Sequence, residues 1–267
     1  MTERSEVMSH IAGPLHVERL GPEGPPMVFL HPNPMDSSCW LYQMAHFSTW
    51  YRTIGIDLPG YGRSPRADAG VTMEEIAEAC WSAVDEVTTD PAILVGCSVG
   101  AWLAPYMEHL SPARTLALVL NGVGYSPDKE FARRRIASYS EHGVEFRREH
   151  ASAVLSPAFA KTPMAGYLTE LFCERNERAD GPTIVEMFRA LELPDPDWLW
   201  SGISVPTLVI TGTEDNAHPR ALVLPDHIPD CELVVMEGAG HACHLERPWE
   251  FDAAMIDFLS RRAGLRI

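Results

Sequence analysis

Short β-branched apolar runs alternate along the chain with longer stretches of helical spacing. The short runs are bounded by Gly or Pro and are almost continuously apolar, which is typical of strands in a parallel sheet with both faces covered. Strands are expected at residues 26–30, 53–58, 92–96, 115–121, 206–212 and 231–236. Helices are expected at residues 72–87, behind a Thr-x-x-Glu capping pattern, and at 99–110 and 248–262. The alternation predicts an α/β fold with a mostly parallel central sheet flanked by helices.

The strand signals stop between Tyr125 and Gly202. This stretch reads as four or five short helices, because Gly and Pro residues interrupt it at short intervals. A chain of 267 residues accommodates one large domain with an insertion of this size. We therefore expect an α/β core formed by residues 1–124 and 203–267, and a helical cap, or lid, formed by residues 125–202.

Composition and charge limit which binding partners and which cellular compartment are expected for this protein. The 37 acidic and 21 basic residues give a formal charge of −16, which repels phosphate backbones and anionic lipids, so neither nucleic acid nor a membrane is expected as a partner. The first twenty residues carry charges where a signal peptide needs an apolar run of about 7 to 15 residues. Six scattered cysteines suggest no disulfide framework. We expect a cytoplasmic protein with reduced thiols.

One serine lies in a Gly-x-Ser-x-Gly pattern, directly after a buried strand and before a helical stretch. The serine is Ser98, and the glycines are Gly96 and Gly100. A nucleophilic serine on a sharp strand-to-helix turn has strained backbone angles, and glycines two residues to each side leave room for the turn. Cys97 has valines at the corresponding positions, so we expect it to be a packed thiol.

A serine nucleophile needs a base that is held by a third group. Two later loops supply such residues, each just beyond the carboxyl end of an expected parallel strand, where open α/β sheets gather their sites. The first contains Asp215 and the second contains His241. Two alternatives stay open for the acid: Asp215 could only cap the next helix, and Glu214 is a rival. His244 has the spacing of a metal ligand relative to His241, but no second cluster supplies further ligands. We therefore expect His244 either to support the catalytic residues from behind or to pack in the core, and we expect no metal.

At this point the sequence resembles the α/β-hydrolase fold family over nearly its whole length. The closest likeness is to the branch of 3-oxoadipate enol-lactonases, esterases and C–C bond hydrolases, in which the helical insert is a lid over the active site. The resemblance is carried by residues 29–34 (FLHPNP), 57–64 (DLPGYGRS), 96–100 (GCSVG), 212–215 (GTED) and 240–248 (GHACHLERP).

The first of these loops departs from the family pattern, because Pro32 follows His31 where glycine is usual. Prolines have no N–H, so Asn33 carries the only main-chain donor between the histidine and residue 35. Its position matches the family's first oxyanion donor, and the N–H of Val99 would be the second. The resemblance implies that His31 braces this loop. The order His-x-Asn-Pro is also similar to haloalkane dehalogenases, but those use an aspartate where this chain has a serine.

These residues predict a cofactor-independent serine hydrolase acting on a small-molecule carboxylic ester or lactone, with Ser98 as nucleophile, His241 as base and Asp215 as its orienting acid. Three alternatives stay open: cleavage of a C–C bond next to a ketone, a perhydrolase activity, and a small-molecule receptor without catalysis. The protein is expected to be a monomer or a homodimer.

Two features of the sequence bear on the substrate pocket. The run Arg133, Arg134 and Arg135 is expected to be a solvated helix face, with binding of a substrate carboxylate as the alternative. Trp102 is expected in the core rather than in the pocket.

Overall fold

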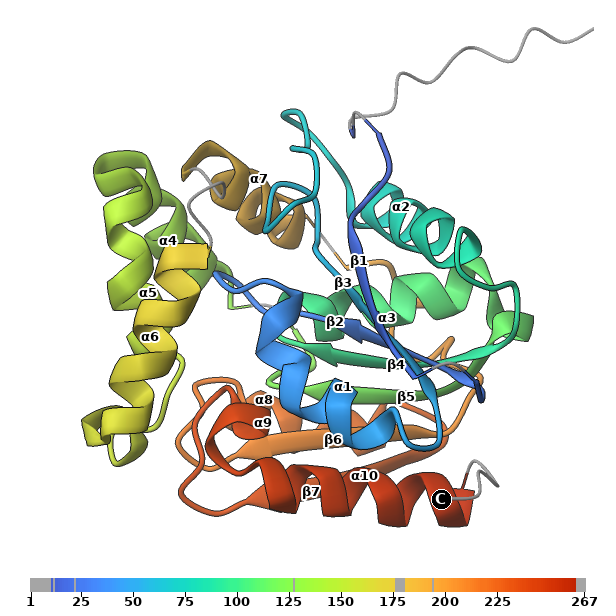
Figure 1. Ribbon diagram of the computed structural model, residues 1–267. Coiled ribbons are helices and arrows are strands. Elements are labelled where there is room, and N and C mark those ends of the chain that lie inside the picture. Colours follow the sequence, from blue (N-terminus) through green and yellow to red (C-terminus); the bar gives the residue numbers. More distant parts are fainter. Residues whose placement is uncertain are drawn as a thin grey trace, which may run out of the picture.

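A computed structural model describes residues 11, 13–21, 23–126, 128–175, 181–193 and 195–262. Its strands form one seven-stranded sheet in the order β1-β3-β2-β4-β5-β6-β7 (Figure 1). Strand β1 pairs with β3 antiparallel, and all the other pairs are parallel. The strands are β1 (Val17–Leu20), β2 (Pro26–Leu30), β3 (Arg52–Ile56), β4 (Ala92–Cys97), β5 (Thr115–Asn121), β6 (Thr207–Gly212) and β7 (Cys231–Met236). The predicted α/β fold with a mostly parallel sheet is confirmed.

The six expected strands are present, with bounds that agree within two residues. The sequence did not reveal β1, whose residues VERL are half-buried or exposed and form no apolar run. Strand β1 lies at the edge of the sheet and pairs only with β3, so it is less buried than the central strands and tolerates polar side chains. The expected bounds of 99–110 and 248–262 are those of α3 and α10.

The helices are α1 (Leu41–Phe47), α2 (Met73–Asp85), α3 (Val99–Leu110), α4 (Lys129–His142), α5 (Arg147–Ala153), α6 (Pro163–Arg175), α7 (Gly181–Glu192), α8 (His218–Ala221), α9 (Cys243–Glu246) and α10 (Pro248–Arg262). Helix α2 begins with the expected capping box: the Thr72 hydroxyl accepts from the Glu75 amide, and the Glu75 carboxylate accepts from the Thr72 amide. The sequence did not reveal α1.

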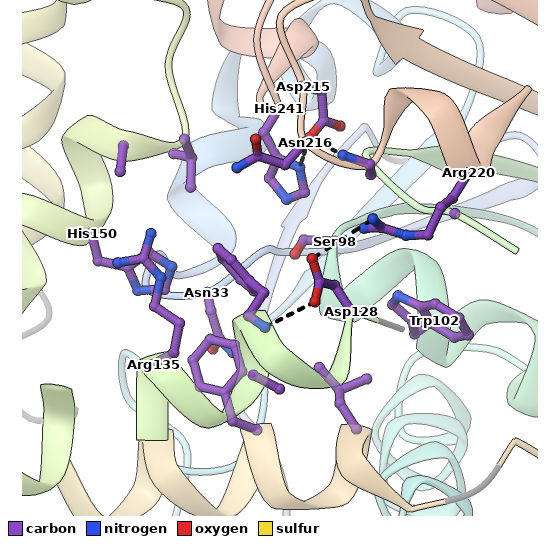
Figure 2. Close-up of a pocket in the computed structure, with 18 of the residues that line it drawn as sticks. Asn33, Ser98, Trp102, Asp128, Arg135, His150, Asp215, Asn216, Arg220 and His241 are labelled. Carbon is purple, nitrogen blue, oxygen red and sulfur yellow. Dashed lines mark hydrogen bonds and ion pairs between the residues drawn. The ribbon is translucent and has the colours of Figure 1, made fainter. Parts of the chain in front are cut away.

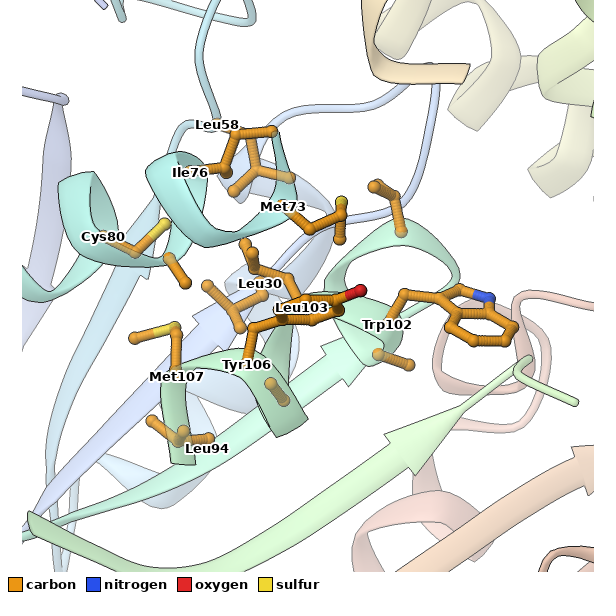
Figure 3. Close-up of a cluster of buried hydrophobic side chains, with 14 of the residues drawn as sticks. Leu30, Leu58, Met73, Ile76, Cys80, Leu94, Trp102, Leu103, Tyr106 and Met107 are labelled. Atoms are coloured by element: carbon orange, nitrogen blue, oxygen red, sulfur yellow. The ribbon is translucent and has the colours of Figure 1, made fainter. Parts of the chain in front are cut away.

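Two apolar clusters cover the two faces of the sheet. Successive residues of a strand point to opposite faces, so Val28 and Leu30 belong to one cluster while Met27 and Phe29 belong to the other. Helices α2 and α3 pack on the first face, and Figure 3 shows Leu30 of the sheet among side chains of these two helices. Helices α1 and α10 supply side chains to the second cluster. Each fully buried Leu, Ile or Phe contributes about 1.5–3 kcal/mol to this core.

Helices α4–α7 lie in the sequence between β5 and β6, which are neighbours in the sheet. The described residues of this segment form no strand. Figure 1 shows α4, α5 and α6 together on one side of the sheet, and α4 packs on α7. The helical nature of the segment is as expected, whereas the cap boundaries 125–202 stay a prediction.

None of the helices that the described residues form is long and apolar enough to cross a membrane. All six cysteines fall within the described residues, and each is a free thiol. The charged start of the chain, residues 1–10, lies outside the described residues.

Candidate active site

Ser98 occupies a strained turn between β4 and α3. Its backbone angles are φ 54° and ψ −119°, and no other non-glycine residue among those described has a positive φ. A Cβ atom on Gly96 would overlap the Gly100 carbonyl, and one on Gly100 would overlap the Leu30 carbonyl. The Ser98 amide donates to the Asn121 carbonyl of β5 at 2.9 Å. The turn is therefore the one that the glycine spacing predicts, and it presents the serine at the carboxyl edge of the sheet.

His241 and Asp215 are joined by a hydrogen bond. The distance from His241 Nδ1 to Asp215 Oδ1 is 2.9 Å, and the Ala217 amide donates to the same oxygen at 2.9 Å. Burial alone would raise the pKa of Asp215. The interaction with His241 and the hydrogen bond from the Ala217 amide outweigh burial, so the pKa of Asp215 lies below its usual value. Burial lowers the pKa of His241, but the Asp215 carboxylate outweighs it and holds that pKa above the usual value. Glu214 is exposed and makes no hydrogen bond to His241.

Ser98, Asp215 and His241 line the same pocket (Figure 2). No hydrogen bond among the described residues joins the Ser98 hydroxyl to the His241 ring. Such catalytic hydrogen bonds are often long or poorly aligned until substrate binds.

Asn121 and Gly122, at the end of β5, hold the loop that carries His241. The Asn121 side-chain amide donates to the His241 carbonyl at 3.1 Å and to Cys97 Sγ at 3.1 Å. A Cβ atom on Gly122 would lie 3.0 Å from the His241 ring. Sequence reasoning missed both residues, although their place at the end of a buried parallel strand was a usable signal. Cys97 is fully buried, and burial raises its pKa, as befits the expected packed thiol.

The loop after β2 carries the Asn33 amide, and Asn33 lines the pocket. That amide takes part in no hydrogen bond among the described residues, nor does that of Val99. The loop closes on itself through Met35, whose amide donates to the Pro32 carbonyl at 3.0 Å. The Asn33 side chain accepts a hydrogen bond from the Tyr61 hydroxyl, and its Nδ2 is buried without a partner.

His31 is fully buried beneath this loop. The Leu58 amide donates to His31 Nε2 at 2.9 Å, and His31 Nδ1 lies 3.1 Å from the Pro32 carbonyl. Nε2 therefore accepts and Nδ1 donates, so the ring is neutral, in keeping with a pKa that burial lowers. These contacts connect the loop to the end of β3, as a bracing residue would.

Helical side chains form the other wall of the pocket. Arg135 and Phe131 of α4, His150 of α5, Phe188 of α7 and the nearby Leu155 line it opposite the loops of the sheet. Trp102 was expected in the core alone, and it is buried but also lines the pocket. The expectation of a solvated arginine run holds for Arg133 and Arg134, which are exposed, and not for Arg135.

One carboxylate ties the helical segment to the His241 loop. Glu246 Oε1 accepts from the Ser156 amide at 2.7 Å and from the Gly240 amide at 3.1 Å, and Oε2 accepts from the Ser156 hydroxyl at 2.6 Å. The Glu246 carboxylate thus connects the backbone next to His241 with the segment around Ser156, between α5 and α6.

His244 lies away from the pocket. It is buried and stacks on Trp40 with ring centroids 4.0 Å apart, and burial lowers its pKa to about 3. This is the expected packing role. The described residues contain no group of three or more His, Cys, Asp or Glu side chains that could hold a metal ion.

Comparisons with known proteins place the chain in a family. The model of the alpha/beta hydrolase family matches residues 27–251. The (E)-2-((N-methylformamido)methylene)succinate hydrolase of Acinetobacter baylyi is 24% identical over 243 residues, which cover 89% of this chain and 91% of that protein.

Solved structures agree with that match. An esterase from Thermogutta terrifontis, solved with malate bound, superimposes with a TM-score of 0.81 at 25% identity, covering 92% of this chain and 93% of that one. The enol-lactonase from Burkholderia xenovorans LB400 superimposes with a TM-score of 0.83 at 21% identity, covering 92% and 96%. The resemblance in the sequence motifs is thereby confirmed, and the chain belongs to the alpha/beta hydrolase family.

Proposed function

We propose that this protein is a cofactor-independent serine hydrolase that cleaves a carboxylic ester or a lactone. The observation that carries the proposal is the hydrogen bond of 2.9 Å between His241 and Asp215 in the pocket that also holds Ser98, on its strained turn. A serine, a histidine and a buried carboxylate in that arrangement are the parts that nucleophilic acyl transfer needs.

The reaction begins when the Ser98 hydroxyl attacks the carbonyl carbon of the substrate and His241 Nε2 takes the hydroxyl proton. Asp215 accepts from Nδ1, which holds the ring in the tautomer that leaves Nε2 free and stabilises the imidazolium that forms. The amides of Asn33 and Val99 donate to the negative oxygen of the tetrahedral intermediate. His241 then protonates the departing alcohol oxygen, and an acyl ester remains on Ser98.

Deacylation repeats these steps with water. His241 removes a proton from water as the water attacks the acyl ester, and the same proton returns to the Ser98 oxygen when the acid leaves. A lactone follows the same path, except that its alcohol group stays attached to the acyl chain. In this proposal residues 125–202 act as a cap that excludes bulk water and selects the substrate.

The relatives support hydrolysis of this kind. The Acinetobacter baylyi relative is named as the hydrolase of a substituted succinate, and the structural neighbours are named as an esterase and an enol-lactonase. The serine on its elbow favours acyl transfer over a receptor without catalysis, because a receptor has no need of a strained nucleophile.

Trapping the acyl-enzyme tests the proposal. The wild-type protein is mixed with 4-nitrophenyl esters of increasing chain length, quenched, and analysed by intact and peptide mass spectrometry. We expect a burst of 4-nitrophenolate and an acyl adduct on the peptide that contains Ser98, with neither in Ser98→Ala. Hydrolysis without an adduct at Ser98, or no turnover of any ester or lactone in a panel, would contradict it.

A further inference from the structure

The helical wall of the pocket carries a positive charge that forms no ion pair with a carboxylate of the described residues. The charge belongs to Arg135, which has no carboxylate within the 4.0 Å of an ion pair. Its guanidinium carbon lies 4.8 Å from the ring centroid of Phe131 and 5.3 Å from that of Phe146. In a protein with a formal charge of −16, acidic side chains are abundant, so a half-buried arginine that forms no ion pair is unusual and calls for an explanation.

The other charged groups of the pocket have partners or are solvated. Arg220 lies 3.8 Å from Asp128, whose second oxygen accepts from the Phe131 amide at the start of α4. Asp215 is bound to His241, and Glu214 is exposed. Arg135 is therefore the cation that remains for a ligand.

Burial lowers the pKa of Arg135, and Tyr139 and the Glu149 carboxylate, which lies beyond ion-pair distance, offset only part of that effect. An arginine keeps its proton even so, and the cost of its burial falls when an anion completes the site. The rings of Phe131 and Phe146 lie within cation–π distance of the guanidinium but do not supply the negative charge of a carboxylate.

His150 offers a second donor to the same anion. Its ring is buried in the pocket wall, and Nδ1 lies 2.8 Å from the Tyr139 hydroxyl. Burial and the positive charge of Arg135 keep the pKa of His150 well below its usual value, so the ring is neutral. When the Tyr139 hydroxyl donates to Nδ1, the hydrogen of the ring sits on Nε2 and is free for a ligand. In the view of Figure 2, Arg135 and His150 lie on one side of Ser98 and Arg220 lies on the other.

We propose that Arg135, assisted by His150, binds a carboxylate of the substrate, so that the preferred ester or lactone carries a second, ionised carboxyl group. A guanidinium presents parallel N–H donors that match the two oxygens of a carboxylate. One uncompensated positive charge matches one carboxylate, whereas a phosphate dianion would remain half unpaired. This inference rests on the proposed function and adds the substrate class to it.

The test compares two matched sets of substrates. One set consists of mono-4-nitrophenyl esters of glutaric, adipic and pimelic acid, and the other replaces the free carboxylate of each by a primary amide. The readout is the ratio of kcat/KM for the anionic ester to that for the amide ester, which a general loss of folded protein does not move. We expect a ratio of at least about 10 in the wild type for the chain length that fits.

Variants of the helical wall should change that ratio selectively. Arg135→Gln should lower kcat/KM for the anionic ester about 10- to 100-fold and for the amide ester less than about 3-fold, and Arg135→Lys should restore part of the ratio. His150→Leu should lower the ratio by a smaller factor. Arg134→Gln is the matched control, because it removes an exposed arginine from the adjacent position of the same helix and should leave the ratio unchanged.

A ratio near 1 in the wild type at every chain length, or an equal loss on both esters in Arg135→Gln, would overturn the carboxylate site. An unchanged ratio in His150→Leu would overturn the part assigned to His150. If the wild type cleaves no ester at all, the proposed function has failed, and adipate binding measured by calorimetry then tests the anion site alone. Adipate should bind the wild type and Arg134→Gln equally and Arg135→Gln at least about tenfold more weakly, and equal binding to all three would contradict the site.

Discussion

The two walls of the pocket are held in different ways. On the sheet side, Ser98, Asp215 and His241 each follow a parallel strand and are fixed by backbone contacts, such as the bond from the Ser98 amide to Asn121. On the helical side, Arg135 is held by aromatic rings and lacks a carboxylate partner among the described residues. In the proposed reaction, the sheet side would therefore be preorganised before substrate binds, whereas the helical side would be completed by a carboxylate of the substrate.

The largest loss should follow removal of the proposed nucleophile, Ser98, from the sheet side. Ser98→Ala should fold normally and lower kcat by several orders of magnitude, because the glycines and not the hydroxyl set the turn. Steady-state ester hydrolysis and circular dichroism measure the two effects. Cys97→Ala is the control and should be almost silent. Activity above about one percent in Ser98→Ala would remove Ser98 from the mechanism.

The acid that orients the base should come next. Asp215→Asn keeps the shape of the side chain but favours the wrong tautomer of His241, so kcat should fall about a thousandfold. Glu214→Gln removes an exposed neighbouring carboxylate and should cost little. Measuring both variants with the same ester decides between the two acids, and the opposite ranking would assign the role to Glu214.

The oxyanion loop should contribute slightly less. Asn33→Pro deletes the one main-chain donor between Pro32 and Pro34, so kcat should fall about a hundredfold to a thousandfold. Asn33→Ala keeps the amide but loses the contact with the Tyr61 hydroxyl, so it should retain much of the rate. If the two variants lose kcat equally, the side chain and not the amide is the donor.

The pH dependence should report the state of His241. Protonated His241 cannot accept the serine proton, and the Asp215 carboxylate raises the pKa of His241 despite burial. The kcat/KM profile should therefore fall as the pH drops, by about tenfold per unit below a midpoint above the ordinary value of about 6.5. In Asp215→Asn the midpoint should move to lower pH, since burial, Arg135 and Arg220 all lower the pKa of His241 and the Asp215 carboxylate no longer opposes them. A flat profile between about pH 5 and 8 would exclude a histidine base.

The smallest effect should come from the junction of the two walls. Ser156→Ala removes the hydroxyl that donates to Glu246 but keeps the Ser156 amide, so the free energy of unfolding should fall by about 1–2 kcal/mol while kcat changes little. Urea denaturation and ester hydrolysis on the same sample measure both. A loss of kcat larger than that of Asn33→Ala would mean that the junction also positions catalytic groups.

The sheet side was predictable because its signals are local. A strand followed by glycines around Ser98, and loops that begin where other strands end, place three side chains at one edge without knowledge of distant contacts. The helical side was not predictable in the same way. Adjacent residues of a helix point about 100° apart, so one of three consecutive arginines faces the pocket, and only the docking of α4 decides that it is Arg135. Nothing local distinguishes His150, and β1 is hidden by its polar composition.

The bond network of Glu246 bears on how such a protein can acquire new substrates in evolution or in the laboratory. An insert exchanged between homologous scaffolds is a natural way to graft a different specificity onto an unchanged catalytic edge. Here the graft would sever two hydrogen bonds to Glu246 unless the incoming segment also presents an amide and a hydroxyl where Ser156 stands. A chimaera whose insert lacks these two donors leaves the Glu246 carboxylate with the Gly240 amide as its remaining donor among the described residues, so the cost of the exchange falls on the loop of the recipient scaffold that carries His241.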